Sequence, residues 1–310
     1  LRREVGLEVA VRDIYQWPTI RDLAAHSAPP TVAPTSDAAS RGSSSRATFE
    51  GLSRGTRLLV PLLQAISIYL LSFITSWQLI VTVGVALAFL AGWVSVPVGI
   101  SVLAVLVVVS HPVTLLLSIA AKWLLIGRYR PGRHPVWGFY YFRWWLVERL
   151  TAAANPGSLT GTPLMTLYFR LMGAKVGAGA IIDTPYCCAF DLVRIGRGAA
   201  IGADSHILGY RVEDGMLVFG SVILEDGCYV GIHSSLGLNT RMGKGSRLGD
   251  LSWLEDDAEI PDGQSRLGSP AISAPVNLPR AHHTPRRAFL YGCGHLIALV
   301  LMELMVGLAA

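Results

Sequence analysis

Residues 218–260 read VFGSVILEDGCYVGIHSSLGLNTRMGKGSRLGDLSWLEDDAEI, and this stretch decides the fold. Glycine directly follows four of its aliphatic residues, as Gly231, Gly237, Gly243 and Gly249. An aliphatic residue occupies every sixth position, namely Val218, Leu224, Val230, Leu236, Met242, Leu248, Leu254 and Ile260. Neither an α-helix nor a β-strand repeats every six residues. A fixed period of this kind is the signature of a solenoid, and six residues suit one flat side of a three-sided coil.

The same pattern extends beyond this stretch in both directions. Upstream, with a shift of one residue after the third position, the matching residues are Val176, Ile182, Cys188, Ile195 and Ile201. Residues 208–217 are too polar and irregular for a coil face, so we expect a loop that projects outward. Residues 164–172 have the pattern of a short amphipathic helix leading into the coil. The sequence therefore predicts a parallel β-helix domain over residues 164–271.

A second feature is a long apolar run that contains no charged residue. The chain is 52% hydrophobic and 15% charged, and no Asp, Glu, Lys or Arg occurs between Arg57 and Lys122. Because roughly 20 apolar residues span a bilayer, we predict a transmembrane helical hairpin at 57–126, with its turn at 94–99. A further apolar stretch at 288–310 predicts the start of a third transmembrane helix.

The remaining segments have distinct compositions. Residues 29–56 are rich in Pro, Ser, Ala and Thr and predict a flexible linker. Residues 127–163 contain a dense group of Trp and Tyr, and we expect 135–150 to lie along the membrane surface. Residues 272–287 form a second, Pro-containing linker.

Charge and cysteine content exclude several classes of function. The net charge is +5 and the pI is about 9.2, but the basic residues flank the apolar stretches. Lys and Arg in that position mark the cytoplasmic ends of membrane spans, so we expect a multi-pass protein of the cell membrane with its β-helix facing the cytoplasm. We expect no nucleic-acid partner. The four cysteines have neither metal nor disulfide spacing, so we expect no bound metal.

Three motifs support a resemblance to known families. The coil resembles the hexapeptide-repeat, left-handed β-helix acyltransferases, whose G-x-P-A closure is similar to residues 268–271, GSPA. Residues 11–24, VRDIYQWPTIRDLA, resemble the last helix of a phosphopantetheine carrier domain, which assigns 1–28 to the end of such a domain. With 122–128 (KWLLIGR) and 184–187 (TPYC), the order of segments resembles the membrane-bound C-terminal region of single-module nonribosomal peptide synthetases of the ε-poly-lysine synthetase type.

That resemblance implies a function and partners. In that family, tandem membrane-tethered domains join a carrier-bound amino acid to another amino acid or to a growing chain. It implies upstream adenylation and carrier domains, later tandem domains, the lipid bilayer and homo-oligomers as partners. The carrier serine would precede Leu1. We therefore expect no cofactor on this chain, since the substrate would arrive on the phosphopantetheine of the carrier.

Aminolysis of a thioester needs a base for the attacking amine and donors for the developing oxyanion. Hexapeptide acyltransferases commonly place a histidine base near a projecting loop. His206 precedes the 208–217 segment and resembles that base, so it is the leading catalytic candidate. His233, expected in the middle of a later coil face, is the second candidate. Asp204 is the third, as a group that orients a histidine or attracts a cationic amino acid.

The projecting segment supplies candidate substrate contacts. They are Tyr210, Arg211, Glu213 and Asp214. Each of these residues, and each histidine above, also has a purely structural interpretation as a coil-corner or solvated loop residue. Two other functions stay open. The domain could be a non-catalytic trimeric scaffold that gathers carriers at the membrane, or an acetyltransferase that uses acyl-CoA.

Overall fold

The computed structural model describes residues 45–207 and 209–274. It also describes a few isolated residues near each end, namely Trp17, Thr19, Arg21, 290–292, 294–295, 297–298 and 301. The chain divides into two compact units, Leu1–Ser44 and Ser45–Ala310, and nearly all described residues belong to the second. The predicted carrier end at 1–28, the 275–287 part of the second linker and most of the predicted third span lie outside the described residues.

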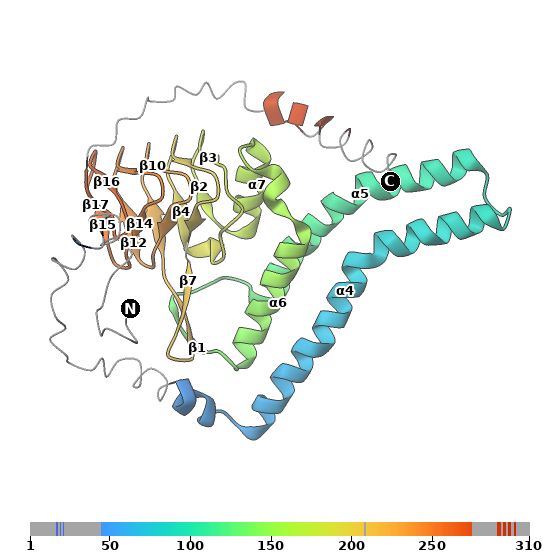
Figure 1. Ribbon diagram of the computed structural model, residues 1–310, viewed down its shortest axis with the longest axis horizontal. Helices are drawn as coiled ribbons and strands as arrows, with labels where there is room; N and C mark the ends of the chain where they lie inside the picture. The colour runs from blue at the N-terminus through green and yellow to red at the C-terminus, as the bar shows by residue number, and fades with distance from the viewer. Residues whose placement is uncertain are drawn as a thin grey trace. The chain divides into compact units, whose positions relative to one another are not determined.

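Between residues 54 and 192, the described helices and helical turns lie before the coil or near its start (Figure 1). In chain order they are α4 (Arg54–Leu90), α5 (Val96–Ala121), the π-helical turn η1 (Lys122–Ile126), α6 (Phe139–Ala154), the 3₁₀ turn η2 (Pro156–Leu159), α7 (Pro163–Met172) and the 3₁₀ turn η3 (Phe190–Leu192). The predicted amphipathic helix at 164–172 is therefore confirmed as α7.

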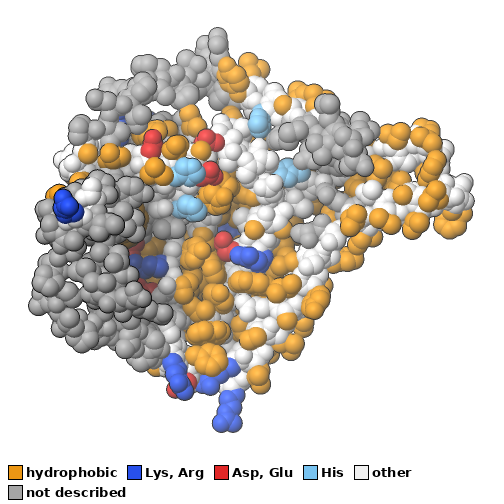
Figure 2. Space-filling model, in the orientation of Figure 1, with side chains coloured by type: hydrophobic (Ala, Val, Ile, Leu, Met, Phe, Trp, Pro, Cys, Tyr) orange, Lys and Arg blue, Asp and Glu red, His pale blue; other side chains and the backbone are white. Residues whose placement is uncertain are grey.

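Helices α4 and α5 form the predicted hairpin, with the turn at 91–95. Two segments of it, Arg54–Ile74 and Val96–Ile126, are long and apolar enough to cross a membrane. Figure 2 shows hydrophobic side chains over much of the visible surface of these helices. Many of those on α4 and α5 are exposed, including Leu58, Tyr69, Phe73 and Leu116. The expected flexible linker is too long, because residues 45–50 are helical and α4 begins at Arg54.

Short strands form the three faces of a parallel coil. The first face contains β2 (Lys175–Val176), β4 (Val193–Ile195), β9 (Val222–Leu224), β12 (Thr240–Met242) and β15 (Glu259–Ile260). The second contains β3 (Ile181–Ile182), β5 (Ala200–Ile201), β10 (Tyr229–Val230), β13 (Arg247–Leu248) and β16 (Ser265–Leu267), with β17 (Ile272–Ser273) antiparallel at its end. The third contains β6 (His206–Ile207), β11 (Ser235–Leu236) and β14 (Trp253–Leu254). The predicted parallel β-helix is confirmed, and its six-residue period is typical of the left-handed form.

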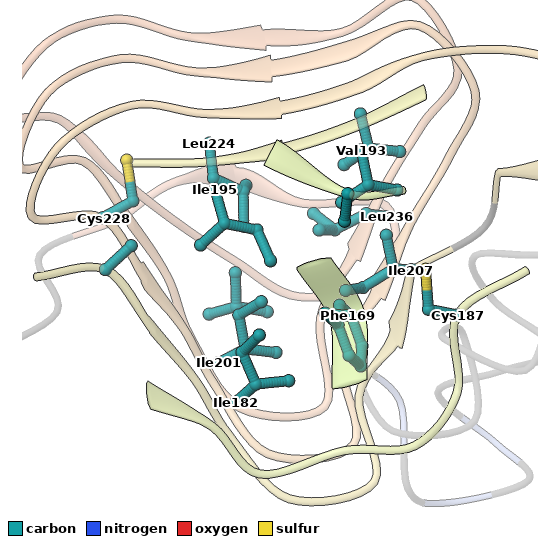
Figure 3. Packing of buried hydrophobic residues seen from close by; sticks show 14 of the residues in the cluster. Phe169, Ile182, Cys187, Val193, Ile195, Ile201, Ile207, Leu224, Cys228 and Leu236 are labelled. Carbon is teal, nitrogen blue, oxygen red and sulfur yellow. The ribbon is translucent and has the colours of Figure 1, made fainter. Parts of the chain in front are cut away.

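The period-six residues fill the interior of this coil. From Leu224 to Ile260, every residue in the series is at most 1% exposed. Figure 3 shows Ile182, Ile195 and Leu236, which come from the three different faces, pointing into the common interior. From β9 onward successive coils are 18 residues apart, so each inward side chain stacks on the one in the previous coil.

Two positions of the predicted series are wrong, and so is the expected loop between residues 208 and 217. Val218 pairs with Arg133 and Arg211 in an antiparallel sheet outside the coil. Cys188 also faces away from the coil interior, whose position Cys187 takes through a bridge to Ile207. The expected loop at 208–217 is a hairpin, because hydrogen bonding to a third strand orders it. Its strands are β7 (Tyr210–Glu213) and β8 (Met216–Phe219), and β8 also pairs with β1 (Gly132–Pro135).

The helical hairpin is fixed to the start of the coil by polar contacts. Lys122 follows α5 and is fully buried, with its ammonium 2.8 Å from Asp191 Oδ2. The same carboxylate oxygen accepts a hydrogen bond from Tyr129 N. On α5, Ser118 Oγ lies 3.2 Å from Tyr168 Oη on α7. A buried ion pair fixes geometry more than it stabilises a fold, so we interpret this pair as an orienting contact between helix and coil.

The aromatic segment forms a helix that buries part of its aromatic side chains inside the protein. Residues 139–154 form α6, which packs against α5 and buries Phe142 and Trp144 inside the protein. Trp144 contacts Tyr210 of the projecting hairpin, with ring centroids 4.9 Å apart. Packing inside the protein therefore accounts for Phe142 and Trp144, and the position of the segment relative to a membrane stays a prediction.

Close stacking of the coils makes a direct prediction. A Cβ added at Gly237 would lie 2.7 Å from Asp256 N and 2.9 Å from the carbonyl carbon of Glu255 in the next coil. We expect Gly237→Ala to lower the free energy of unfolding by about 1–3 kcal/mol, since overpacked sites cost this much. Ser235→Ala, on the preceding strand, is the control and should change it by less than about 0.5 kcal/mol. Chemical denaturation monitored by circular dichroism measures both, and equal stability of the two variants would contradict the close approach.

Candidate functional site

A cavity of about 440 Å³ lies between α6, the loop after β3 and the start of the hairpin β7–β8. Residues from four separate parts of the chain line it, namely Glu148, Thr151, Ala152, Asn155, Pro156, Gly157, Pro185, Tyr186, Cys187, Cys188, His206, Ile207 and Tyr210. Its volume falls within the usual range for small-molecule sites. A histidine, a carboxyl and two tyrosine rings line this one concave surface, which makes it the candidate site.

His206 enters this cavity because of strand alternation. It precedes Ile207 on β6, and since Ile207 points into the coil, His206 must point outward. The backbone of His206 is fixed by a 2.8 Å hydrogen bond from its N–H to Ser234 O in the next coil. Its imidazole is stacked on the Tyr186 ring, with centroids 4.6 Å apart and an interplanar angle of 11°.

The loop that carries Tyr186 is held by its own hydrogen bonds. Thr184 Oγ1 is buried, donates to Ser205 O at 2.7 Å and accepts from Tyr186 N at 3.2 Å. Tyr186 O accepts a hydrogen bond from Ile207 N at 3.0 Å. The stacking of Tyr186 on His206 is therefore supported on both sides by backbone contacts.

The opposite wall is one face of α6. Glu148, Thr151, Ala152 and Asn155 are spaced three or four residues apart, so they share a face of the helix and its C-terminal end. Asn155 is the left-handed C-cap residue of α6, with φ 47°. Sequence reasoning did not identify this face, although the spacing of Glu148, Thr151 and Asn155 is visible in the sequence.

Cys188 lies between Glu148 and the aromatic core. Trp144 Nε1 donates to Cys188 Sγ at 3.0 Å, and the Cys188 thiol is close enough to the Glu148 carboxyl for each to affect the pKa of the other. Burial raises the pKa of Glu148 to about 7, although the Cys188 hydrogen bond and Arg149 oppose the shift. Burial also raises the pKa of the Cys188 thiol well above its ordinary value, an effect that the charge of Glu148 increases.

The two cysteines are therefore protonated, buried residues. For Cys187, burial is again the main cause of a pKa well above the ordinary thiol value, followed by the charge of Glu148. Since the thiolate is the nucleophilic form, neither side chain is suited to attack a substrate. This agrees with their interpretation from the sequence as small buried residues.

Of the predicted catalytic residues, only His206 lies in the cavity. Asp204 and His233 both occupy exposed coil corners, with φ of 53° and 50°. The expectation that His233 lies in the middle of a face is wrong, because Ser235–Leu236 form that strand and His233 belongs to the turn before it. His233 N donates to Ala203 O at 2.9 Å, so this corner is hydrogen-bonded to the matching corner of the previous coil.

Of the predicted substrate contacts, only Tyr210 lines the cavity. Arg211 points to other partners, since it forms ion pairs with Asp256 and, at 2.7 Å, with Glu213. Asp214 lies at the far turn of the hairpin, where its carbonyl accepts a hydrogen bond from Thr48 Oγ1. Alternation along β7 places Tyr210 and Arg211 on opposite sides of the strand, which explains why neighbours in sequence separate in space.

Comparison with known proteins adds two relatives. No protein-family model matches the chain. The chain is 36% identical over 178 residues to a δ-poly-L-ornithine synthetase from Acinetobacter baumannii, a match that covers 57% of this chain and 13% of that protein. It is 30% identical over 135 residues to a 2,3,4,5-tetrahydropyridine-2,6-dicarboxylate N-succinyltransferase from Methylobacterium, covering 39% of this chain and 45% of that protein. The chain thus spans less than half the length of either relative.

Solved structures of hexapeptide-repeat proteins are also similar. A hexapeptide-repeat acetyltransferase from Vibrio cholerae matches with a TM-score of 0.33 and 14% identity, over 41% of this chain and 90% of that chain. A serine acetyltransferase from Brucella abortus matches with a TM-score of 0.26 and 14% identity, over 52% and 67% respectively. In the part of this chain that the structure describes, no group of three His, Cys, Asp or Glu side chains is arranged to hold a metal ion.

The raised pKa of Glu148 predicts a pH effect on stability. Folding raises this pKa from 4.5 to about 7, so the protonated carboxyl is favoured in the folded state. Stability from this group is fully present below about pH 4.5 and is lost as the pH rises through 7. A shift of this size corresponds to at most roughly 3 kcal/mol.

We therefore expect Glu148→Gln to remove this pH dependence. Between pH 5 and pH 8.5, the melting temperature of the wild-type protein in detergent should fall by several degrees relative to that of the variant. Differential scanning fluorimetry at both pH values measures this difference. Parallel pH profiles for the two proteins would show that the Glu148 carboxyl is not enclosed.

Proposed function

We propose that this chain catalyses acyl transfer, moving an aminoacyl or peptidyl group from a carrier-bound thioester to an amine. The observation that carries the proposal is His206, which points outward from a coil edge into a cavity shared with Glu148, Tyr186 and Tyr210. The two relatives support it, because one is named a poly-L-ornithine synthetase and the other an N-succinyltransferase. Both names describe attachment of an acyl group to nitrogen.

The reaction makes a C–N bond and breaks a C–S bond. The amine nitrogen attacks the thioester carbonyl, and His206 accepts the proton that the nitrogen loses. The imidazolium then returns that proton to the departing sulfur, so the products are an amide and a free thiol. An imidazole suits both steps because its ordinary pKa is close to neutral pH.

Stacking on Tyr186 gives His206 a fixed plane without enclosing it. His206 is exposed, so an incoming amine and the thioester arm can both reach the ring. The cavity also offers hydrogen-bond donors on its walls, including Tyr210 and Asn155. Such groups are the chemical type that stabilises a developing oxyanion.

We also propose that this chain is anchored in the cell membrane. Helices α4 and α5 would cross the bilayer and return, with the coil on the cytoplasmic side, since Arg54, Arg57, Arg128 and Arg130 lie beside the two ends of the hairpin. Upstream adenylation and carrier domains would load the substrate, and later domains of the same polypeptide would continue the assembly. Homo-oligomers through the coil are part of the same proposal.

Replacement of His206 tests the catalytic role. We expect His206→Ala to lower the rate of amide formation about 100-fold or more, because a positioned base contributes this much. The assay supplies an aminoacyl-pantetheine thioester and a free amine to the full chain in detergent micelles and follows the amide product by mass spectrometry. His233→Ala, a change at an exposed corner, should stay within about two-fold of wild type.

The same assay separates the competing functions. Unchanged turnover of His206→Ala with an intact assembly would favour the scaffold and remove the base assignment. An acyl-CoA donor is the second candidate, supported by the similarity to an N-succinyltransferase. Saturable binding of free coenzyme A and turnover of acetyl-CoA faster than the pantetheine thioester would favour that donor.

A further inference from the structure

The base proposed above belongs to a column of side chains on the outside of the third coil face. On each strand of that face the second residue is at most 2% exposed and fills the coil interior, so the first residue points outward. Strand register pairs Ser235 with His206 on one side and with Trp253 on the other. A parallel bridge between the residue after Tyr186 and the residue after His206 places Tyr186 in the same column. The order along the coil axis is therefore Tyr186, His206, Ser235 and Trp253.

The two neighbours of His206 in this column meet its ring in different ways. Tyr186 stacks on one face of the imidazole, with an interplanar angle of 11°. Because the stacking direction follows the column, Ser235 lies on the side of the other face, about one strand spacing of 4.8 Å away. The ring nitrogens lie in the plane of the imidazole, so neither of them points at Ser235. The imidazole and the hydroxyl can therefore act on different atoms of one substrate.

The hydroxyl of Ser235 has no structural role in the coil. Ser234, the preceding residue, is buried and donates from Oγ to Gly249 O at 2.8 Å. Ser235 is half-buried, and within the described part of the chain its Oγ has no hydrogen-bond partner. Its backbone is nevertheless fixed, since Ser235 N donates to Ser252 O at 2.9 Å. A donor held in place beside the base is thus available to a ligand, and preorganised donors of this kind stabilise developing charge.

We propose that Ser235 is a second catalytic residue, whose hydroxyl donates a hydrogen bond to the carbonyl oxygen of the donor thioester. This inference rests on the proposed function. As the amine nitrogen forms its bond to the carbonyl carbon, the C=O electron pair moves to oxygen, and Ser235 stabilises the negative charge there. The electron pair then returns, the C–S bond breaks, and the proton that His206 accepted goes to sulfur. Ser235 keeps its own proton throughout.

The column also separates the positions of the two substrates. Tyr186 lines the cavity and Ser235 does not, so the two flank the imidazole on the cavity side and on the open coil face. An amine in the cavity would approach His206 from the Tyr186 side, while the thioester carbonyl would lie over Ser235. Tyr210 and Asn155 belong to the hairpin and to α6, whereas Ser235 is on the strand next to the base, which fixes its distance from the imidazole.

Removal of the hydroxyl tests this role. In the assay with an aminoacyl-pantetheine thioester and a free amine, we expect Ser235→Ala to lower kcat about 100-fold, because loss of one oxyanion donor has this effect. KM for the thioester should stay within about three-fold, since the interaction is made mainly in the transition state. Ser265→Ala removes another half-buried, outward-facing serine, on the second coil face, and is the matched control that should leave kcat unchanged.

A pair of variants with the same shape isolates the hydroxyl from the fold. Ser235→Thr keeps a donor and Ser235→Val does not, and both β-branched side chains suit a strand. We expect kcat of the threonine variant to exceed that of the valine variant about ten-fold or more. Equal rates for these two variants would remove the inference and leave acyl transfer by His206 standing. If the wild-type protein itself forms no amide, the proposed function falls, and this inference falls with it.

Two further measurements separate hydrogen-bond donation from other roles of Ser235. The pH midpoint of kcat/KM should be the same for wild type and Ser235→Ala, because the hydroxyl does not bind the imidazole. A shifted midpoint would show that Ser235 acts through His206 and would overturn the proposal. Intact-protein mass spectrometry after incubation with the thioester alone should show no acyl adduct. An adduct on Ser235 would overturn the proposal as well, since it would make Ser235 a nucleophile.

Discussion

The structure depends on one constraint, which is that each coil must lie directly on the previous one with its backbone hydrogen bonds satisfied. Aliphatic side chains at every sixth position supply the apolar interior, and glycine follows several of them where the next coil leaves no room for a Cβ. Gly231 and Gly243 show this, because a Cβ on either would lie within 2.6 Å of a backbone nitrogen one coil later. Burial drives the stacking, and the pairing fixes which outward residues become neighbours.

The candidate site arises where this regular stacking is interrupted. Paired positions in β4 and β9 are 29 residues apart rather than 18, and the additional chain forms the hairpin β7–β8 beside His206. Pairing of β8 with β1 brings the segment before α6 to the same place. Near the other end of that segment, the Lys122–Asp191 pair joins α5 to the coil. Helix α6, the coil and the base of the hairpin β7–β8 therefore meet, and the cavity lies between them.

Sequence reasoning predicted the parts of this arrangement that depend on local periodicity. The period of six predicted the coil, the uncharged run predicted the hairpin of helices, and the position of His206 before an interruption made it the leading catalytic candidate. It failed where long-range pairing decides the outcome. Val218 continues the period but pairs in β8, and His233 differs from His206 only in falling at a corner. Glu148 was missed because α6 appeared to be a membrane-surface segment, and only tertiary packing brings that helix against the coil.

The chemistry of the cavity depends on placing two titratable groups in different surroundings. His206 is exposed and stacked on one ring, so solvent and an incoming substrate can both reach the imidazole. Glu148 is partly buried, and burial raises its pKa to about 7, so a modest local change decides whether it is charged. An arriving ammonium group would itself ionise the carboxyl, because an opposite charge favours the charged form. Burial raises the pKa of the Cys187 and Cys188 thiols well above the ordinary value, so neither supplies a thiolate. Among the groups that line the cavity, the exposed imidazole of His206 is therefore the one placed to meet an attacking amine from solvent.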